Sequence, residues 1–368
     1  MVGRRDYSSR ITSEGHPLRL FLTGHTGFKG SWFAFCSAQR GVDVHGYALE
    51  PISGGFFETA GVRAMLAGHT IADVRNDAAL ARAIERAQPD ALVHMAAQPL
   101  VRQSYREPRE TFDVNVMGTL SVLEAASEAG IPRVLIITSD KVYRNVGTTV
   151  GYAEDATLGG YDPYSASKAM AEILTESWTR SFGAFGQAFA TARAGNVIGG
   201  GDRCLDRLLP DVLRAIDHDR PVVLRYPGAV RPWQHVLDVT SGYLAVLNQP
   251  TPGDFDSWNL GPDPADRMTV GDVADCAVQR WGKGSVQTSD GPHPHEAAML
   301  TLDASKARYQ LGWKPALTAR EAVEWTVDWE VGVRNGAAAA DLAEDQISTY
   351  RERSGDGSLS LSLYASPL

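Results

Sequence analysis

The chain has 368 residues, a hydrophobic content of 43% and a formal net charge of −9 at pH 7. This length allows either one large core or two unequal domains. The acidic balance argues against a general nucleic-acid binder, because such binding depends largely on neutralised phosphates.

Residues 1–17 contain no apolar segment of the kind found in a signal peptide, so we interpret them as a disordered leader. Short apolar stretches then alternate with stretches of helical spacing. Strands are expected at 18–23, 42–49, 91–96, 133–139 and 188–194, and helices at 28–39, 76–87, 109–129 and 163–182. This alternation predicts an α/β fold with a Rossmann-type doubly wound parallel sheet.

The first expected strand leads into TGHTGFKGSW, in which Gly24, Gly27 and Gly30 follow a G-x-x-G-x-x-G spacing. These glycines allow a tight turn and a close approach of the backbone to a pyrophosphate, and the following helix offers free N–H groups. Because the motif follows a strand and opens a helix, it predicts a dinucleotide site. The loop residues expected to contact the cofactor are Gly24, Thr26, Gly27, Phe28, Lys29 and Gly30.

The end of the second expected strand favours NAD over NADP. Ala48 stands where an acidic residue would bind the ribose, Glu50 follows, and Pro51 takes the place of a basic residue that could hold a 2′-phosphate. We therefore expect NAD with weak ribose anchoring by Glu50. Asp73 and Val74 are expected at the adenine edge, with a simple strand-end cap by Asp73 as the alternative.

Tyr164 and Lys168 are four residues apart, which places them on one face of a helix. A lysine ammonium there can lower the pKa of the tyrosine and hold the nicotinamide ribose, so that the phenolate takes a hydroxyl proton. Ser139, at the end of an apolar strand, would hydrogen-bond the same hydroxyl. Together the three residues predict a catalytic centre beside the dinucleotide.

These motifs resemble those of extended short-chain dehydrogenases/reductases that act on nucleotide sugars, from residue 18 to about residue 315. The most specific segments are GHTGFKGSW, HMAAQPLVRQSY (94–105), GGYDPYS (159–165) and RPWQHV (231–236), and together they are most similar to 4,6-dehydratases of CDP-glucose. The resemblance implies further NAD contacts from Ala96, Ala97 and Asn115. It also implies a homodimer, built from the helices at 109–129 and 163–182.

The strand–helix alternation breaks down past Asn196, where glycine and proline become frequent. We therefore expect an NAD-binding Rossmann domain and a smaller C-terminal nucleotide-sugar-binding domain. The first would comprise 18–192 and about 231–259, and the second about 193–230 and 260–335. The rest of the chain, 336–368, is expected to form a loosely ordered tail.

A 4,6-dehydratase must do more than oxidise C4: it needs an acid for the C6 hydroxyl and a base for the C5 proton. In similar sugar dehydratases the two residues after the active-site serine or threonine, usually Asp and Glu, fill these roles. Here they are Asp140 and Lys141. Asp140 suits the acid if burial raises its pKa. Lys141 is open between a C5 base, a stabiliser of the enolate and an organiser of water, and a simple Asp–Lys ion pair is the alternative without chemistry.

The resemblance also implies a substrate pocket drawn from distant segments. Its expected residues are Gln98, Arg102 and Ser104 after the fourth strand, Arg193, Asn196 and Arg231 near the diphosphate, and His295 and Glu296 in a late loop. No metal site is expected, because the HPH sequence has no accompanying carboxylate or cysteine cluster and the three cysteines are far apart. Sparse cysteines indicate reduced thiols and a cytoplasmic location.

The sequence therefore predicts a lyase of deoxysugar biosynthesis that uses NAD and a nucleotide-sugar substrate, with no nucleic-acid or membrane partner. The first hypothesis is conversion of CDP-D-glucose to CDP-4-dehydro-6-deoxy-D-glucose and water. The alternatives are a 4,6-dehydratase of a dTDP- or UDP-linked sugar, a nucleotide-sugar 4-epimerase, and a non-catalytic dinucleotide sensor. Asp140 argues against the epimerase, and the intact Ser139, Tyr164 and Lys168 argue against the sensor.

Overall fold

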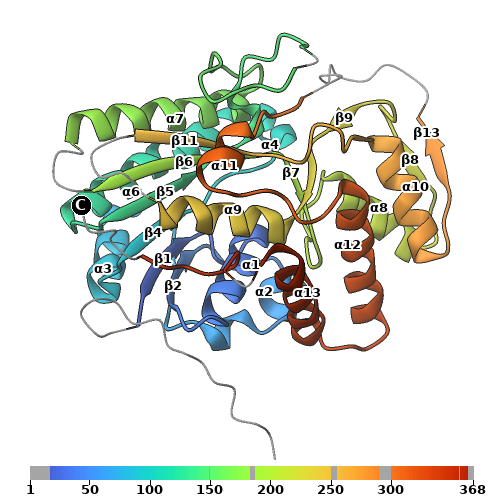
Figure 1. The fold of residues 1–368 in the computed structure, drawn as a ribbon, viewed down its shortest axis with the longest axis horizontal. Helices are drawn as coiled ribbons and strands as arrows, with labels where there is room; N and C mark the ends of the chain where they lie inside the picture. Colours follow the sequence, from blue (N-terminus) through green and yellow to red (C-terminus); the bar gives the residue numbers. More distant parts are fainter. Residues whose placement is uncertain are drawn as a thin grey trace, which may run out of the picture.

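The computed structural model describes residues 17–148, 150–182, 187–249, 255–289, 300–355 and 357–363. A seven-stranded sheet of order β11-β6-β5-β4-β1-β2-β3 forms its centre, and every neighbouring pair is parallel (Figure 1). Its strands are β1 (Arg19–Thr23), β2 (Asp43–Ala48), β3 (Gly68–Ile71), β4 (Ala91–His94), β5 (Arg133–Ile137), β6 (Ala188–Ala194) and β11 (Phe255–Leu260). The predicted doubly wound Rossmann-type sheet is confirmed.

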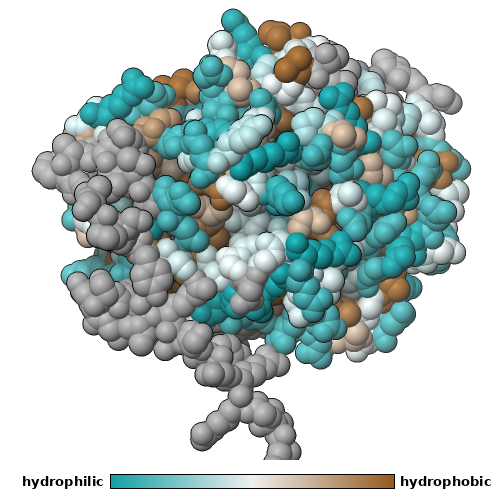
Figure 2. All heavy atoms as spheres, in the orientation of Figure 1, coloured by the Kyte–Doolittle hydropathy of each residue, from teal (hydrophilic) through white to brown (hydrophobic). Residues whose placement is uncertain are grey.

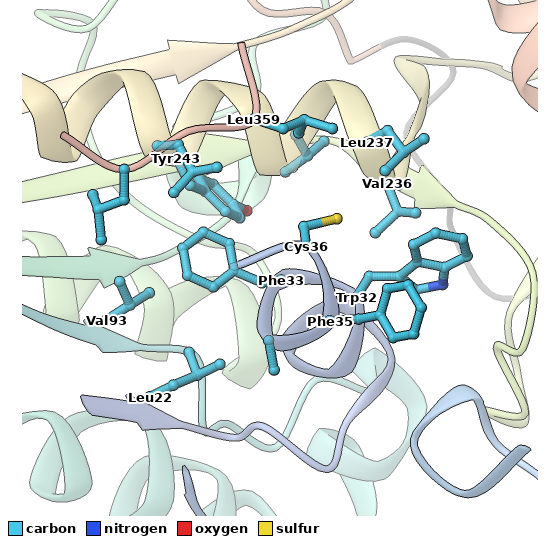
Figure 3. Close-up of a cluster of buried hydrophobic side chains, with 14 of the residues drawn as sticks. Leu22, Trp32, Phe33, Phe35, Cys36, Val93, Val236, Leu237, Tyr243 and Leu359 are labelled. Atoms are coloured by element: carbon cyan, nitrogen blue, oxygen red, sulfur yellow. The ribbon is translucent and has the colours of Figure 1, made fainter. Parts of the chain in front are cut away.

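Helices cover both faces of this sheet because its strands are apolar on both sides. In β1, Leu20 and Leu22 pack into one core and Phe21 packs into the other. The first core includes residues of α1 (Phe28–Ala38) and α9 (Val236–Asn248), and the second includes residues of α3 (Asp77–Ala87) and α6 (Gly118–Glu128). Figure 3 shows the first core, where Phe33 and Tyr243 lie between the strands and α9.

A separate apolar cluster holds the smaller C-terminal part of the molecule together. It joins α8 (Leu208–Asp217), α10 (Val270–Trp281) and α12 (Ala319–Arg334), which gather on the right in Figure 1. Three separate two-stranded sheets accompany these helices: β7 (Asn196–Ile198) with β10 (Trp233–His235), β9 (Val230–Arg231) with β12 (Met268–Thr269), and β8 (Val222–Leu224) with β13 (Val286–Thr288). The Rossmann half thus has a core on each face of its sheet, and the smaller C-terminal part has an apolar cluster of its own.

The helix expected at 109–129 is interrupted. It begins as α5 (Pro108–Phe112), continues through a π-helical turn, η2 (Asp113–Met117), and ends as α6. A π turn inserts one residue into the α-helical repeat and often occurs at functional sites. Here the turn carries Asn115, which is buried.

The remaining described elements are short helices and two long ones, one in the middle of the chain and one near the C-terminus. They are α2 (Phe56–Thr59), η1 (Val62–Met65), α4 (Val101–Arg106), η3 (Asp140–Val142), α7 (Pro163–Phe182), α11 (Ser305–Gln310) and α13 (Ala339–Ser354). No helix among the described residues is long and apolar enough to cross a membrane. On the face drawn in Figure 2, hydrophilic residues predominate and hydrophobic ones occur singly or in small groups.

The expectation of a loosely ordered tail is wrong for the described part of residues 336–368. The hydroxyl of Tyr350 in α13 donates to Asp238 Oδ1 of α9 at 2.9 Å. Leu359 and Leu361 are each 1% exposed within the first core, and Arg40 Nη2 donates to Ser360 Oγ at 2.7 Å. The segment is an integral part of the Rossmann half. Of the expected leader, residues 1–16 lie outside the described residues.

Candidate active site

The glycine loop after β1 forms a tight cradle at the start of α1. Gly24 has a φ of 74°, and a Cβ atom there would lie 2.6 Å from the backbone nitrogen of Ala96. A Cβ atom on Gly30 would lie 2.2 Å from the carbonyl oxygen of Gly24. Gly27 caps α1 without any side-chain hydrogen bond. There is no room for a side chain at Gly24 or Gly30. The first N–H groups of α1 can donate hydrogen bonds to an anion, as a pyrophosphate site requires.

The loop side chains point in different directions. Thr26 Oγ1 donates to the carbonyl oxygen of Leu49 at 2.9 Å, which ties the loop to the end of β2. Lys29 Nζ donates to the hydroxyl of Tyr243 at 3.5 Å. Burial, together with Arg207 and Lys168, lowers the pKa of Lys29 to about 7, against the opposing effect of Asp140. Lys29 therefore joins the phosphate loop to the catalytic residues electrostatically.

The adenosine end of the expected site contains partners that the sequence did not suggest. Glu50 is exposed beyond β2, and Val74 is buried. The Asp73 carboxylate accepts hydrogen bonds from Arg75 Nε at 2.9 Å and Nη2 at 2.6 Å, which hold the pKa of Asp73 below its usual value. His25 Nε2 lies 2.7 Å from His69 Nδ1. Asp73 is thus an ion-pair partner as well as a strand-end residue.

The turn that follows β5 brings the three polar residues Ser139, Asp140 and Lys141 together. Ser139 Oγ donates to Asp140 Oδ1 at 3.0 Å and accepts from the backbone N–H of Lys141 at 3.3 Å. Asp140 is 1% exposed, and its Oδ2 has no hydrogen-bond partner among the described residues. A buried carboxylate oxygen without a partner is costly for folding, which is typical of a functional group.

Tyr164 and Lys168 lie on one face of α7, against this turn. Lys168 Nζ donates to the carbonyl oxygen of Ile137 at 3.1 Å, and burial lowers the pKa of Lys168 to about 8, against the opposing charge of Glu172. Burial raises the pKa of Tyr164, while the charge of Lys141 and a hydrogen bond with Ser139 lower it. The expected net lowering of the Tyr164 pKa is therefore not met, because desolvation dominates.

Lys141 acts on Tyr164 and is not merely half of a strand-end ion pair. Its charge is the largest of the influences that lower the Tyr164 pKa. The salt bridges of the described residues include none between Lys141 and Asp140. All three residues of the turn thus influence the Tyr164 phenol: Lys141 and Ser139 lower its pKa, and the charge of Asp140 raises it.

Asn115 hydrogen-bonds both to the loop after β4, which carries Ala96 and Ala97, and to α7, the helix of Tyr164 and Lys168. Its Oδ1 accepts from the Gln98 backbone N–H at 2.9 Å, and its Nδ2 donates to the Gln98 carbonyl oxygen at 3.1 Å and to Ser167 Oγ at 2.9 Å. The amide is thus fully engaged with protein groups. In this structure the Asn115 side chain positions the loop after β4, and its amide atoms bond to protein groups instead of facing the cofactor.

Two residues expected to face the sugar, Gln98 and Ser104, form hydrogen bonds with neighbouring residues of the chain instead. Gln98 Nε2 donates to Thr111 Oγ1 at 2.9 Å, and its Oε1 accepts from the Leu100 N–H at 2.6 Å. Ser104 is fully buried and donates to the Val101 carbonyl oxygen at 2.7 Å. The expectation is not met for either side chain, because each satisfies local backbone or hydroxyl groups. Arg102 is half exposed and pairs with Asp206 at 2.5 Å.

The expected diphosphate residues separate into two groups. Asn196 and Arg231 lie close together, since the Asn196 N–H donates to the carbonyl oxygen of Pro232 at 3.0 Å. Arg193 instead forms a buried ion pair with Glu172 at 2.8 Å, so its guanidinium is committed to the protein. The expectation that Arg193 binds the diphosphate is therefore wrong, because Glu172 occupies its guanidinium. His295 and Glu296 lie outside the described residues.

Arg207 is a site residue that sequence reasoning missed. Its Nη1 lies 3.1 Å from Asp202 Oδ2, and its charge acts on both Tyr164 and Lys29. The only signal in the sequence is the alternation of acidic and basic residues in GDRCLDR, which is equally typical of surface ion pairs. Among the described residues, no cluster of three or more His, Cys, Asp or Glu could hold a metal ion.

Comparison with known proteins gives consistent similarities. The NAD dependent epimerase/dehydratase family matches residues 20–261. The CDP-glucose 4,6-dehydratase of Salmonella typhimurium is 42% identical over 344 residues, which cover 90% of this chain and 96% of that protein. The dTDP-glucose 4,6-dehydratase of Xanthomonas campestris is 28% identical over 332 residues, covering 84% of this chain and 92% of that protein.

Solved structures share the fold at lower identity. The dTDP-glucose 4,6-dehydratase of Bacillus anthracis, in complex with NAD, has a TM-score of 0.75 and 22% identity, and the match covers 86% of this chain and 98% of that chain. The UDP-glucose 4-epimerase of Thermotoga maritima, with UDP-glucose, has a TM-score of 0.74 and 21% identity over 86% and 99% of the two chains.

Proposed function

Because this chain belongs to the NAD dependent epimerase/dehydratase family, we propose that it is a hydro-lyase that converts CDP-D-glucose to CDP-4-dehydro-6-deoxy-D-glucose and water. The observation that carries the proposal is Asp140, a buried carboxylate with a free oxygen one residue after Ser139. An epimerase has no leaving hydroxyl and hence no use for such an acid. The 42% identity to the CDP-glucose 4,6-dehydratase of Salmonella typhimurium supports the choice of nucleotide.

The glycine cradle and the uncapped start of α1 fit NAD, since a side chain at Gly24 or Gly30 would occupy the space that a pyrophosphate needs. Bound NAD would supply a hydride acceptor for C4 and a hydride donor for C6. The residues assigned to it are the glycine loop, the ends of β2, β3 and β4, Asn115 as the residue that shapes the pocket, and Lys168 on the nicotinamide ribose.

Tyr164 would take the proton of the C4 hydroxyl, and Ser139 would form a hydrogen bond with the same oxygen. The burial that raises the Tyr164 pKa makes nearby cations necessary, and Lys141 supplies the largest such influence. We assign to Lys141 a second role on the same oxygen: its ammonium stabilises the enolate that develops when a water organised by Lys141 takes the C5 proton. An ammonium is suited to this role without giving up its proton.

Asp140 would protonate the C6 hydroxyl as it leaves. Its Oδ1 is held by Ser139 at 3.0 Å, which leaves Oδ2 for the substrate. Asn196 and Arg231 would hold the diphosphate between the Rossmann half and the smaller domain, and Arg102, which pairs with Asp206, stays a predicted contact of the sugar. His295 and Glu296 stay predicted contacts of the nucleotide.

We also propose that the enzyme is a cytoplasmic homodimer. Met117 of η2 and Met170 and Ile173 of α7 are 50%, 45% and 54% exposed, although η2 and α7 contact each other, so their outward sides present an apolar surface. The three cysteines are free thiols, as expected in a reducing compartment. Light scattering of the wild type and of Ile173→Lys would separate a dimer from a monomer.

The function is tested with a panel of CDP-, dTDP- and UDP-glucose, with NAD supplied. The 4-ketone product absorbs in alkali, and CDP-glucose should give the highest kcat/KM. A higher value with dTDP-glucose would move the assignment to the first rival. Formation of the C4 epimer, without a ketone, would move it to the epimerases.

A further inference from the structure

Glu172 is a buried carboxylate to which the mechanism above gives no role. It lies on α7 one helical turn beyond Lys168 and is 1% exposed. It accepts hydrogen bonds from Thr138 Oγ1, from Thr191 Oγ1 at 2.6 Å and from Arg193 Nη2 at 2.8 Å. Its three partners come from the end of β5 and from β6, so one side chain joins the catalytic helix to two strands.

The network continues past Arg193 to segments that are distant in sequence. Arg193 Nη1 donates to the Tyr143 hydroxyl at 2.6 Å and to the Glu154 carbonyl oxygen at 2.9 Å. The Tyr143 hydroxyl donates in turn to Asn259 Oδ1 of β11 at 2.7 Å. The ion pair is therefore held rigidly on both sides, which is the condition under which a buried pair is tolerated.

Stability alone explains this pair poorly. Removing two charges from water is expensive, and apolar side chains of the same size often serve a core equally well. The position of the pair suggests another reason. Thr138 directly precedes Ser139, and Lys168 bonds to the carbonyl oxygen of Ile137. Glu172 and Lys168, on one face of α7, thus both hydrogen-bond to the end of β5, at Thr138 and at Ile137.

The charges around Lys168 make Glu172 important for its protonation. Lys29 of α1 repels the Lys168 ammonium, and Arg193 lies on the far side of Glu172. His94 of β4 faces Lys168 but is neutral, because burial lowers its pKa to about 3. Tyr164, on the same helix, is neutral when its pKa is raised. Glu172 is the charge that opposes desolvation of Lys168.

We propose that Glu172 is a positioning residue that keeps Lys168 protonated and fixes the Thr138–Asp140 turn against the catalytic helix. Its effect on catalysis rests on the proposed dehydratase function. Its effect on Lys168 does not, because that lysine is assigned to the NAD ribose. NAD affinity is therefore a readout that needs no sugar nucleotide.

The test measures the NAD dissociation constant by calorimetry between pH 6 and pH 10 for wild type, Glu172→Gln and Thr191→Val. Wild type should lose affinity as Lys168 deprotonates. In Glu172→Gln the loss should begin about one pH unit lower, which corresponds to roughly tenfold weaker binding in the affected range. Thr191→Val removes one hydrogen bond to the same carboxylate but no charge, so its pH profile should match that of wild type.

Arg193→Gln provides a test of opposite sign if Glu172→Gln fails to fold. It leaves the Glu172 charge unopposed, so the loss of NAD affinity should move to higher pH. A Glu172→Gln profile that overlays wild type, or an equal shift in Thr191→Val, would overturn the positioning role. A shifted profile in an enzyme that does not dehydrate CDP-glucose would support the positioning role and reject the proposed function.

Discussion

Single residues carry the step that separates a dehydratase from other enzymes of this fold. Asp140 is buried, one of its oxygens is held by Ser139, and the other has no partner among the described residues. Lys141 directly follows Asp140, and its charge acts on Tyr164. In the proposed mechanism, oxidation at C4 and elimination across C5 and C6 depend on different side chains, so a substitution should separate them.

Asp140→Asn should leave oxidation intact and slow elimination. The amide keeps the shape and the hydrogen bond of the carboxylate but has no acidic proton, so elimination should fall by about 10²-fold or more. The reduced cofactor should then accumulate in a single turnover with CDP-glucose, which stopped-flow absorbance measures. Dehydration at the wild-type rate, or no reduced cofactor at all, would show that Asp140 is not the elimination acid.

Asp238 should make stability depend on pH. Burial raises its pKa to about 7, although the backbone N–H of Ala316 and the Tyr350 hydroxyl donate to Oδ1. The native state therefore retains a proton that the unfolded chain releases near pH 4, so the free energy of unfolding should fall as pH rises from about 4 to 7.

The Asp238→Asn variant has no proton to lose and tests this directly. Its Tm relative to wild type should rise between about pH 4 and pH 7 and level off above that, with the two proteins closest at low pH. Thermal unfolding followed by circular dichroism at several pH values measures this difference. A constant difference across the range would mean that Asp238 does not titrate there.

At the scale of elements, the glycine loop and the start of α1 form one unit, and their close packing requires residues without a Cβ atom. Gly30→Ala would place a Cβ atom 2.2 Å from the Gly24 carbonyl oxygen, so the first turn of α1 must move away from the loop. NAD affinity should fall by at least tenfold, as measured by calorimetry. Gly228→Ala is the matched control, because a Cβ atom there meets no atom within 4 Å, and it should bind NAD normally.

At the scale of the whole molecule, the C-terminal segment closes the core of the Rossmann half. Leu359 is 1% exposed, so Leu359→Ala should lower the free energy of unfolding by about 2–5 kcal/mol, the usual cost of a buried leucine truncation. Leu205→Ala makes the same change at a side chain that is 63% exposed and should cost less than about 0.5 kcal/mol. Chemical denaturation measures both, and equal losses would contradict the packing.

The sequence by itself determined the features that depend on short spacings. The glycine loop, the Tyr164–Lys168 pair and the strand ending in Ser139 each occupy a few consecutive residues, and the alternation of apolar and helical stretches is local. Because parallel strands end at one edge of a sheet, these motifs meet once the fold class is known. The NAD cofactor and a candidate catalytic centre could therefore be predicted from the sequence.

Only the tertiary structure decided which polar side chains are free. Arg193 and Gln98 have residue types suited to a ligand, yet Glu172 and the loop after β4 occupy them. Leu359 and Leu361 alternate with serines in SLSLSL (358–363), a spacing typical of a half-buried strand, but this local pattern does not indicate which distant core they enter. A sequence pattern records which groups a residue carries, whereas burial and pairing depend on partners that lie far away in the chain and are brought close only by folding.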